Sequence, residues 1–441
     1  EEGQLNRVII AGCSSRTHDA LFQRLVRQAG LNPYLLELVN LRDQCSRVHQ
    51  QQSHLANRKA QELTRVAVGR ACAAQAVHKD RHPCLPSALV IGGGVAGMTA
   101  ALAIADSGYY VHLVERTEAL GGNLLNLYYV AEGYNPQRLL RDLINRVRAH
   151  TRITAYTRTE VIRHWGHVGH FHAVLRASRG NGDTEELEIE HGVTIVATGA
   201  RETHEHPLLA LPGVITQSEL EEKIIYRPEE VAALSNVVMI QCVRPPGMPE
   251  YCSRVCCTNT IKNAIRLKLF KPDCRVSVLY KNIVTYGFRE EYYTEARALG
   301  VVFLRYTDDD PPDVQIADGR LRVGVRDLAL NRRLTLPADL VTMSMSVAPS
   351  EGTAALARML RVPLSSEGFF EEAQMKLRPM DFMREGIFLA GMAHYPKFLE
   401  ESISHALAAA ARALTLLSQG ALHLGGIVAQ VDPSKCVGCL T

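Results

Sequence analysis

A glycine-rich turn between two regular elements restricts the possible folds of this chain more than any other feature of its sequence. Residues 88–97 (ALVIGGGVAG) place Gly92, Gly94 and Gly97 in the spacing G-x-G-x-x-G, after an apolar strand and before a helix expected over 98–107. The first glycine permits a tight turn, the second lets the backbone approach a phosphate, and the third lets the helix pack closely on the strand. The pattern predicts the opening of a doubly wound α/β domain.

An acidic residue at the end of the next strand makes this signal more specific. The strand over 110–115 ends at Glu115, about 20 residues after the turn, where a carboxylate can accept hydrogen bonds from the ribose of an adenosine. Arg116 follows it, and a second glycine turn contains Gly121, Gly122 and Asn123. This combination resembles two-domain flavin reductases more than plain NAD dehydrogenases, so we predict that the site binds FAD.

Two later apolar strands are expected to complete the FAD site. The strand over 193–199 ends at Thr198 and Gly199, and the strand over 386–390 leads into Gly391. With Val95 and Ala96 at the start of the first helix, these residues are predicted to contact the cofactor, because the carboxyl ends of parallel strands meet at one edge of the sheet.

The order of the predicted elements indicates four regions. We expect a small N-terminal α/β domain over 1–85, an FAD domain over 86–226 and 350–420, an inserted domain over 227–349, and the start of a ferredoxin-like domain over 421–441. The FAD domain is thus predicted to be interrupted by the inserted one, and the strand at 386–390 and the helix at about 402–418 to close it.

The inserted domain has a βαβ pattern without a phosphate loop. Its strand over 236–243 runs into 244–257, which contains no glycine triplet, so we predict poor NAD(P)H binding there. Cys252, Cys256 and Cys257 stand at the start of the next helix, where the helix dipole and the neighbouring Arg244 and Arg254 would favour thiolates. The spacing C-x-x-x-C-C matches neither the C-x-x-C redox motif nor a zinc knuckle, so metal ligands, redox thiols and a structural cluster all remain open.

Eleven cysteines in a chain without the pattern of a secretory signal point to metal or redox chemistry rather than to a disulfide framework. Cys13 follows the first strand and Cys45 lies in a turn. Cys436 and Cys439 form the C-x-x-C opening of a bacterial ferredoxin signature, which needs further cysteines. We therefore interpret the C-terminus as a truncation.

Composition excludes two classes of partner. The net charge is +3, with 49 basic and 46 acidic side chains, which provides no global field for nucleic acid or an anionic membrane. The most apolar late segment, 402–418, is interrupted by His405 and Arg412 and is too short and too polar for a membrane span. We expect a cytoplasmic protein.

Several segments together resemble one family, the flavin-containing A subunits of heterodisulfide reductase and their bacterial homologues. Besides the flavin fingerprint, the segments that carry the resemblance are 12–19, 30–34, 44–49, 251–257, 368–371, 376–379 and 391–397. The resemblance implies an α/β Rossmann-type flavoprotein with two dinucleotide domains and a thioredoxin-reductase-like core. It also implies an iron–sulfur site in the N-terminal domain and ferredoxin modules at the C-terminus.

The resemblance implies roles for particular residues. Cys13 and Cys45 become candidate ligands of an N-terminal 4Fe-4S cluster, the segment 251–257 contributes further thiols, and Lys397 is expected to lie against the isoalloxazine. The cysteines that family members usually carry ahead of the first strand are absent, so this cluster is expected to be incomplete. Between Gly122 and Asn135 the sequence has no cysteine, so an inserted ferredoxin module found in some members is missing.

These features predict an FAD-containing electron-transfer subunit of a heterodisulfide-reductase-like complex, which exchanges electrons between flavin and iron–sulfur clusters. The resemblance implies electron bifurcation at the flavin, other subunits and a ferredoxin-type carrier as partners, and a homodimer. One alternative is a self-contained FAD-dependent disulfide reductase that uses Cys252, Cys256 and Cys257 as redox thiols. Another is a flavin-bearing scaffold that mainly docks partners.

Other polar residues near the expected site have simpler interpretations. His394 and His405 are expected to be packed, hydrogen-bonded histidines rather than proton donors. Glu400 and Glu401 are expected to stabilise the N-terminus of the following helix. The basic run over 138–148 is interpreted as a solvated helix face that could also dock an acidic ferredoxin.

Overall fold

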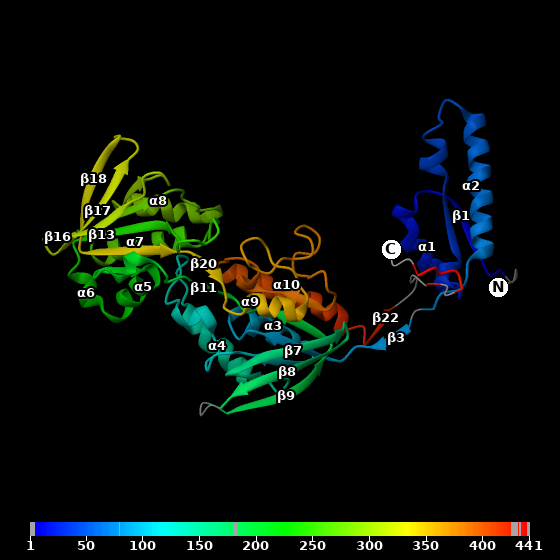
Figure 1. The fold of residues 1–441 in the computed structure, drawn as a ribbon, viewed down its shortest axis with the longest axis horizontal. Coiled ribbons are helices and arrows are strands. Elements are labelled where there is room, and N and C mark those ends of the chain that lie inside the picture. The colour runs from blue at the N-terminus through cyan, green and yellow to red at the C-terminus, as the bar shows by residue number, and fades with distance from the viewer. Residues whose placement is uncertain (1–4, 79, 180–182, 425–430, 432–433, 439–441) are drawn as a thin grey trace. The chain divides into compact units, whose positions relative to one another are not determined.

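The computed structural model describes residues 5–78, 80–179, 183–424, 431 and 434–438. The chain divides into two compact units, which are described separately below (Figure 1). One comprises Glu1–His82 with Leu422–Thr441, and the other comprises Pro83–Ala421. The junctions fall in β3 (Asp80–Pro83) and at the start of β22 (Ala421–Leu424).

The first unit is built around one βαβ motif. Strand β1 (Val8–Gly12) pairs in parallel with β2 (Leu36–Asn40), and α1 (Ser15–Gln28) connects them. Helix α1 begins after Ser14, whose side chain caps it by accepting a hydrogen bond from the Arg16 N–H. The remaining elements of this unit are η1 (Pro33–Leu35), η2 (Arg42–Ser46) and α2 (Ser53–Ala73).

The second unit contains a five-stranded parallel sheet in the order β21-β10-β4-β5-β6. Its strands are β4 (Ser87–Ile91), β5 (Tyr110–Val114), β6 (Ile153–Tyr156), β10 (Val193–Val196) and β21 (Ile387–Leu389). All five residues of β4 are buried, as expected for a central strand covered on both faces. The predicted closure is present, because β21 pairs with β10 although nearly 200 residues of sequence separate them.

Helices and a second layer cover this sheet. Helices α3 (Val95–Asp106) and α10 (Leu399–Leu417) pack against each other, and α3 is almost entirely buried because its residues are nearly all small or apolar. The antiparallel sheet β7 (Thr159–His167), β8 (His170–Ser178) and β9 (Thr184–His191) shares an apolar core with β4. The other elements here are η3 (Gly122–Asn126), α4 (Pro136–Ala149), α9 (Thr353–Leu360) and η6 (Gly391–Ala393).

A second five-stranded parallel sheet has the order β12-β19-β13-β14-β15. Its strands are β12 (Val214–Thr216), β13 (Asn236–Val243), β14 (Arg275–Tyr280), β15 (Val302–Arg305) and β19 (Leu340–Met345). Its helices are α5 (Gln217–Tyr226), α6 (Pro228–Ala232), α7 (Cys256–Phe270) and α8 (Glu290–Ala298), with η4 (Pro207–Ala210) and η5 (Gly287–Arg289). An antiparallel sheet of β16 (Asp313–Ala317), β17 (Arg320–Asp327) and β18 (Arg332–Ala338) packs on it.

The second sheet begins earlier in the sequence than residue 227. Strand β12 pairs with β19, and α5 packs on α7, so both belong with the inserted region. The chain passes between the two parallel sheets through a short antiparallel ribbon of β11 (Ala200–Glu202) and β20 (Val347–Pro349). The predicted α/β architecture of two Rossmann-type sheets is confirmed, with this shift of the predicted boundary.

Among the described helices, none combines the length and the apolar character that crossing a bilayer would require. None of the described cysteines forms a disulfide bond.

Candidate flavin and thiol site

The glycine turn between β4 and α3 has the three distinct roles that its spacing predicts. Gly92 has φ 112°, and a Cβ there would lie 2.3 Å from the Ala197 carbonyl oxygen. A Cβ on Gly97 would lie 1.8 Å from the Gly92 carbonyl oxygen, so only glycine allows this approach of helix to turn. By contrast, a Cβ on Gly94 would meet no protein atom within 4 Å. The space beside Gly94 is therefore open to a ligand.

The Glu115 carboxylate is buried directly beside this turn. Its Oε2 accepts a 2.7 Å hydrogen bond from the Gly93 N–H, and its Oε1 accepts from the Thr117 N–H and hydroxyl at 2.8 Å each. These bonds hold the carboxylate at the end of β5, where the sequence places a ribose acceptor. Arg116 instead directs its guanidinium to the Glu351 carbonyl oxygen at 3.0 Å.

The second glycine turn lies against the first. The Gly121 N–H donates to the Gly93 carbonyl at 2.9 Å, and a Cβ on Gly122 would lie 3.2 Å from the Gly94 Cα. Both residues have positive φ, 134° and 53°. Asn123 follows them, and its Nδ2 donates to the Ala200 carbonyl at 2.8 Å.

The ends of β10 and β21 meet the same turn. A Cβ on Gly391 would lie 2.6 Å from the Ala96 Cβ, so Gly391 lets the end of β21 reach the start of α3. Thr198 follows β10, and its Oγ1 is buried without a hydrogen-bond partner among the described residues. Gly199 beside it has φ 67°.

These residues fit an adenine dinucleotide. Buried polar atoms are normally hydrogen-bonded, so the unpaired Thr198 Oγ1 indicates a missing partner. The open space at Gly94 lies at the N-terminus of α3, where the helix dipole stabilises phosphate charge. Glu115 stands at the ribose position, and Gly121, Gly122 and Asn123 border the same region. The structure brings together the residues that the sequence predicts for FAD, except that the Arg116 side chain is bound to the Glu351 backbone.

A cavity of roughly 510 Å³ continues from this region into the inserted domain. Its walls include Val95, Asn123 and Lys397 from the flavin side and Cys256 from the start of α7. One cavity therefore reaches both the predicted flavin site and a predicted thiol.

Lys397 begins a short hydrogen-bonded chain at this cavity. Its Nζ donates to His394 Nδ1 at 3.0 Å, and His394 Nε2 donates to Glu372 Oε2 at 2.8 Å. Burial is the main cause that lowers the pKa of Lys397 to about 8, helped by the nearby Arg254 charge. Lys397 is thus a cation that can lose its proton within a mildly alkaline range.

The other polar residues of this segment have the simple roles expected of them. The Gly391 N–H donates to His405 Nδ1 at 2.9 Å, and burial lowers the pKa of His405 to about 4. His394 is bonded on both ring nitrogens. Glu401 accepts from the Phe398 N–H at 2.9 Å and so caps the first turn of α10, which Glu400 also occupies.

Four cysteines gather where β13 ends and α7 begins, and one of them, Cys242, was not predicted. Cys242 lies at a bulge in β13 with φ 59°, and Cys256 and Cys257 are the first two residues of α7. Burial raises the pKa of the Cys242 thiol, and the nearby Cys257 and Cys252 raise it further. The spacing C-x9-C-x3-C-C and the position of Cys242 at a strand end were the available signals, since strand ends and helix starts meet at one sheet edge.

The thiols differ in their ionisation. Cys256 donates a hydrogen bond to Cys257, which raises the pKa of Cys256 well above its usual value, together with burial and the neighbouring Cys257, Cys242 and Cys252. The same hydrogen bond lowers the pKa of Cys257 to about 7. The contact between the two thiols is therefore the main cause of their difference in pKa, and the expected effect of the helix start on these thiols stays a prediction.

The neighbouring arginines do not serve the thiols as directly as predicted. The Arg254 guanidinium pairs with Glu401 and bonds Tyr286, and the Arg244 guanidinium pairs with Glu250 at 3.0 Å. The Arg254 backbone N–H does contact Cys252 Sγ at 3.3 Å. Their positive charges are therefore largely compensated by carboxylates.

The loop that carries Cys252 is fixed to the flavin side. The Tyr395 hydroxyl donates to the Cys252 carbonyl at 3.1 Å, and the Tyr251 hydroxyl donates to the Val347 carbonyl at 2.7 Å. Ser253 is buried and its Oγ accepts from the Val347 N–H at 2.9 Å. The segment that contains Lys397 and the thiol loop are thus directly bonded.

The remaining predicted metal ligands lie in the first unit. Cys13 follows β1 and receives a contact from the Arg42 guanidinium at 3.7 Å, and Cys45 is buried in η2. Cys436 is exposed. Cys439 lies outside the described residues. Among the described residues, no group of three metal-ligand atoms within 4.8 Å of one another includes Cys13, Cys45 or any of the four cysteines near α7.

A family model and several solved structures match the second unit. Residues 86–239 match the pyridine nucleotide-disulphide oxidoreductase family model. The solved thioredoxin reductase of T. acidophilum shares the fold, with a TM-score of 0.50 and 15% identity over 76% of this chain and 99% of that one. A variant of the HOCl-induced flavoprotein disulfide reductase RclA from Escherichia coli has a TM-score of 0.51 and 15% identity, over 76% and 72%.

Other relatives match the whole chain and so show which family it belongs to. The A subunit of a CoB-CoM heterodisulfide reductase from Methanosarcina acetivorans is 31% identical over 100% of this chain and 67% of its own length. An iron-sulfur A subunit of a CoB-CoM heterodisulfide reductase from Methanopyrus kandleri is 30% identical over 100% and 80%. The first alignment extends over 539 positions, more than the 441 residues here, so that relative carries additional segments inside the matched region. From these matches, the chain belongs to the oxidoreductase family formed by the A subunits of heterodisulfide reductases.

Proposed function

We propose that this chain is an FAD-bearing electron-transfer subunit in which the flavin exchanges electrons with an iron–sulfur cluster held by Cys242, Cys252, Cys256 and Cys257. The observation that carries the proposal is the single cavity lined by both Val95 and Lys397 on the flavin side and Cys256 on the thiol side. The Tyr395 to Cys252 bond supports it, because it fixes the two sides together.

FAD supplies a centre that can take up electrons in pairs and release them singly. The chain's own part is to bind and orient this group. The N-terminus of α3 and the open space at Gly94 would hold the pyrophosphate, and Glu115 would accept from the ribose hydroxyls. Gly391 and Thr198 place the ends of β21 and β10 at the same turn.

Lys397 and its partners set the charge and hold a proton at the cavity. As an ammonium group, Lys397 favours negative charge on the ring system. Its Nζ proton is directed to His394 Nδ1, and His394 is oriented by Glu372. This chain of bonds fixes the His394 tautomer with its proton on Nε2.

The four thiols suit an iron–sulfur cluster. Soft thiolates are the ligands of such clusters, and four of them complete a 4Fe-4S site. The segment that follows β13 runs from Arg244 to Val255 and replaces the phosphate loop of a nicotinamide domain. We infer that this region gave up NAD(P)H binding and took up a cluster. A site at Cys13 and Cys45, and another at Cys436 and Cys439, would need further ligands.

The partners follow from the family. The relatives are named as subunits of heterodisulfide reductases, so we propose that this chain also works in such a complex, with a ferredoxin-type carrier, as a homodimer in the cytoplasm. Helix α4 carries Arg138, Arg141, Arg146 and Arg148, a basic face that suits an acidic carrier. Electron bifurcation stays a prediction of the resemblance.

The test is the iron content of a Cys242→Ser variant after anaerobic purification. We expect the variant to lose about four iron atoms per chain and its reduced-cluster EPR signal, while FAD stays bound. Cys274→Ser is the matched control, since Cys274 is a buried cysteine of the same domain that lies directly before β14 and does not line the cavity.

Two outcomes would contradict the cluster. Unchanged iron in Cys242→Ser would remove these four cysteines as a cluster site. Two thiols in the iron-free wild type that titrate reversibly to a disulfide would support a self-contained disulfide reductase instead, for which the low pKa of Cys257 is the favouring observation.

A further inference from the structure

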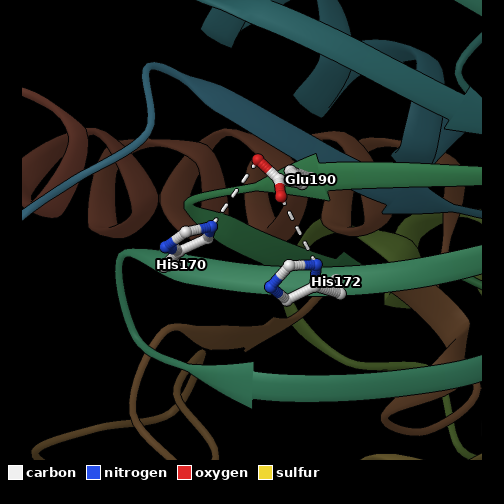
Figure 2. A group of neighbouring side chains, drawn as sticks. All are labelled: His170, His172 and Glu190. Atoms are coloured by element: carbon white, nitrogen blue, oxygen red, sulfur yellow. Dashed lines mark ion pairs between the residues drawn. The ribbon is translucent and has the colours of Figure 1, made fainter.

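A group of metal-binding side chains lies on the β7–β8–β9 sheet, outside the flavin and thiol site. His170 and His172 stand on β8 and Glu190 on β9, and Figure 2 shows their side chains converging. Because side chains alternate along a strand, residues 170 and 172 point to the same face. The antiparallel register places His172 opposite Glu190. The sheet itself therefore assembles the group.

Two nitrogen–oxygen separations in this group are close to the separation between neighbouring ligand atoms of one ion. His170 Nε2 is 3.6 Å from Glu190 Oε2, and His172 Nδ1 is 3.5 Å from Glu190 Oε1. These distances are longer than the usual hydrogen-bond length of about 2.9 Å. Zinc bonds to nitrogen and oxygen of about 2.0–2.2 Å in a tetrahedron place neighbouring ligand atoms about 3.4 Å apart. The three ligand atoms lie within 4.8 Å of one another.

The ring nitrogens that face Glu190 are free to act as ligands. His170 Nε2 and His172 Nδ1 are both shielded from solvent and have no hydrogen-bond partner among the described residues. Leaving a buried polar atom without a hydrogen-bond partner is unfavourable, so such atoms normally have one. A metal ion would be a partner for both nitrogens at once.

Neighbouring side chains hold the site in shape. The Trp165 ring stacks on His172 with centroids 5.1 Å apart and an interplanar angle of 5°, and the His170 ring stacks on it at 5.0 Å. Glu188 places a further carboxylate oxygen 3.6 Å from His172 Nδ1. Rigid neighbours of this kind reduce the entropy lost on binding.

We propose that His170, His172 and Glu190 bind a divalent transition-metal ion, with Zn²⁺ the ion that fits the donor set best. Two imidazole nitrogens and one carboxylate suit zinc, and they leave its fourth position for water or Glu188. The site is independent of the flavin and of the cysteine cluster, since its residues line neither the cavity nor the thiol loop.

The test is zinc binding by the full chain after chelator treatment and alkylation of its accessible thiols. Zinc and iron are counted separately by mass spectrometry after equilibrium dialysis at micromolar Zn²⁺. We expect the wild type to bind about one zinc ion per chain. His172→Gln and Glu190→Gln should each lower the zinc affinity at least tenfold. FAD retention by both variants checks that they fold.

Glu186→Gln is the matched control, because Glu186 lies on the same face of β9 but is paired with Arg176 at 3.0 Å. We expect it to bind zinc as the wild type does. Equal zinc binding by His172→Gln and the wild type would overturn the site. An equal loss in Glu186→Gln would also overturn it, because binding would then follow general acidity of the strand.

Discussion

At the scale of single residues, each glycine of the turn meets a different constraint, and only one of them points to a ligand. Gly92 and Gly97 are required by the protein, since a Cβ at either would lie within 2.3 Å of a carbonyl oxygen. Gly94 is not, because nothing in the protein lies within 4 Å of the same position. A substitution at Gly94 can therefore separate cofactor binding from folding.

We expect Gly94→Ala to fold normally and to lose FAD. The added methyl group enters the space that the pyrophosphate needs, so FAD affinity should fall by at least about tenfold, which is about 1.4 kcal/mol. The measurement is the change in FAD fluorescence when the apoprotein is titrated with FAD. Gly69→Ala, also free of contacts within 4 Å, serves as the control and should leave affinity unchanged. Full FAD affinity in Gly94→Ala would contradict the cofactor placement.

The charge of Lys397 is expected to raise the midpoint potential of the flavin, and this effect should depend on pH. We expect Lys397→Met to lower the two-electron midpoint potential at pH 7 by about 30 mV or more, because an anionic reduced flavin loses a neighbouring cation. The pKa of Lys397 is lowered to about 8, so the wild type itself loses this charge above that pH. The difference between wild type and variant should then shrink by pH 9 in a spectroelectrochemical titration. The exposed Lys376→Met is the control, and an equal effect there would argue against a specific role.

At the scale of elements, two helices begin three residues earlier than predicted. Helix α3 begins at Val95 rather than at 98, because the glycine turn already forms its first turn. Helix α10 begins at Leu399 rather than at 402, because Glu401 bonds the Phe398 N–H. Helices α5 and α7 are joined by the buried pair Glu221 and Lys262, whose oxygen and nitrogen are 2.7 Å apart.

We expect Glu221→Gln to destabilise the protein by about 3–5 kcal/mol, since it leaves the Lys262 charge buried without its partner. The Glu221 and Lys262 side chains are only 5% and 4% exposed, and Glu221 Oε1 also accepts from the Tyr128 N–H at 2.7 Å. Thermal and urea unfolding of the variant measure the loss. Glu222→Gln, at the exposed residue next to Glu221, is the control and should change the free energy of unfolding by less than about 0.5 kcal/mol. Adding Lys262→Met to Glu221→Gln should recover part of the stability, and no recovery would contradict the pairing.

At the scale of the whole molecule, neutral buried histidines link stability to pH. Burial lowers the pKa of His164 and His405 to about 4, and it also lowers the pKa of His191 well below the ordinary 6.5. His164 Nε2 and His191 Nε2 both bond the Thr194 hydroxyl, at 3.0 and 2.9 Å. The unfolded chain therefore binds more protons than the folded chain between pH 6.5 and 4.

Stability should consequently fall as the pH falls from about 6.5 towards 4, by roughly 1.4 kcal/mol per pH unit for each of these histidines. The contribution is complete above the unfolded pKa. Unfolding midpoints in urea between pH 7.5 and 4.5 measure the slope, and His164→Asn should reduce it. A midpoint independent of pH over this range would refute the assignment.

Some residues of the candidate site could be predicted from the sequence and others could not. The residues of the glycine turns and Glu115 were predictable because each acts within one short segment, where spacing alone reports the geometry. Cys242 and Glu372 were not predicted, because no recognised motif relates Cys242 to Cys256 or Glu372 to His394, and only the fold brings each pair together. The family assignment, which rested on several segments together, is confirmed by relatives along the whole chain.

The sequence by itself therefore determined the α/β class, the glycine turn and its acid, and the family. Those features depend on backbone sterics and on contacts between residues close in the chain. The tertiary structure alone decided that β12 belongs with the second sheet, that Cys242, Cys252 and Cys257 lie near Cys256, which lines the cavity, and that His170, His172 and Glu190 converge on one sheet face. These depend on strand register and on the packing of distant segments, which no local spacing encodes.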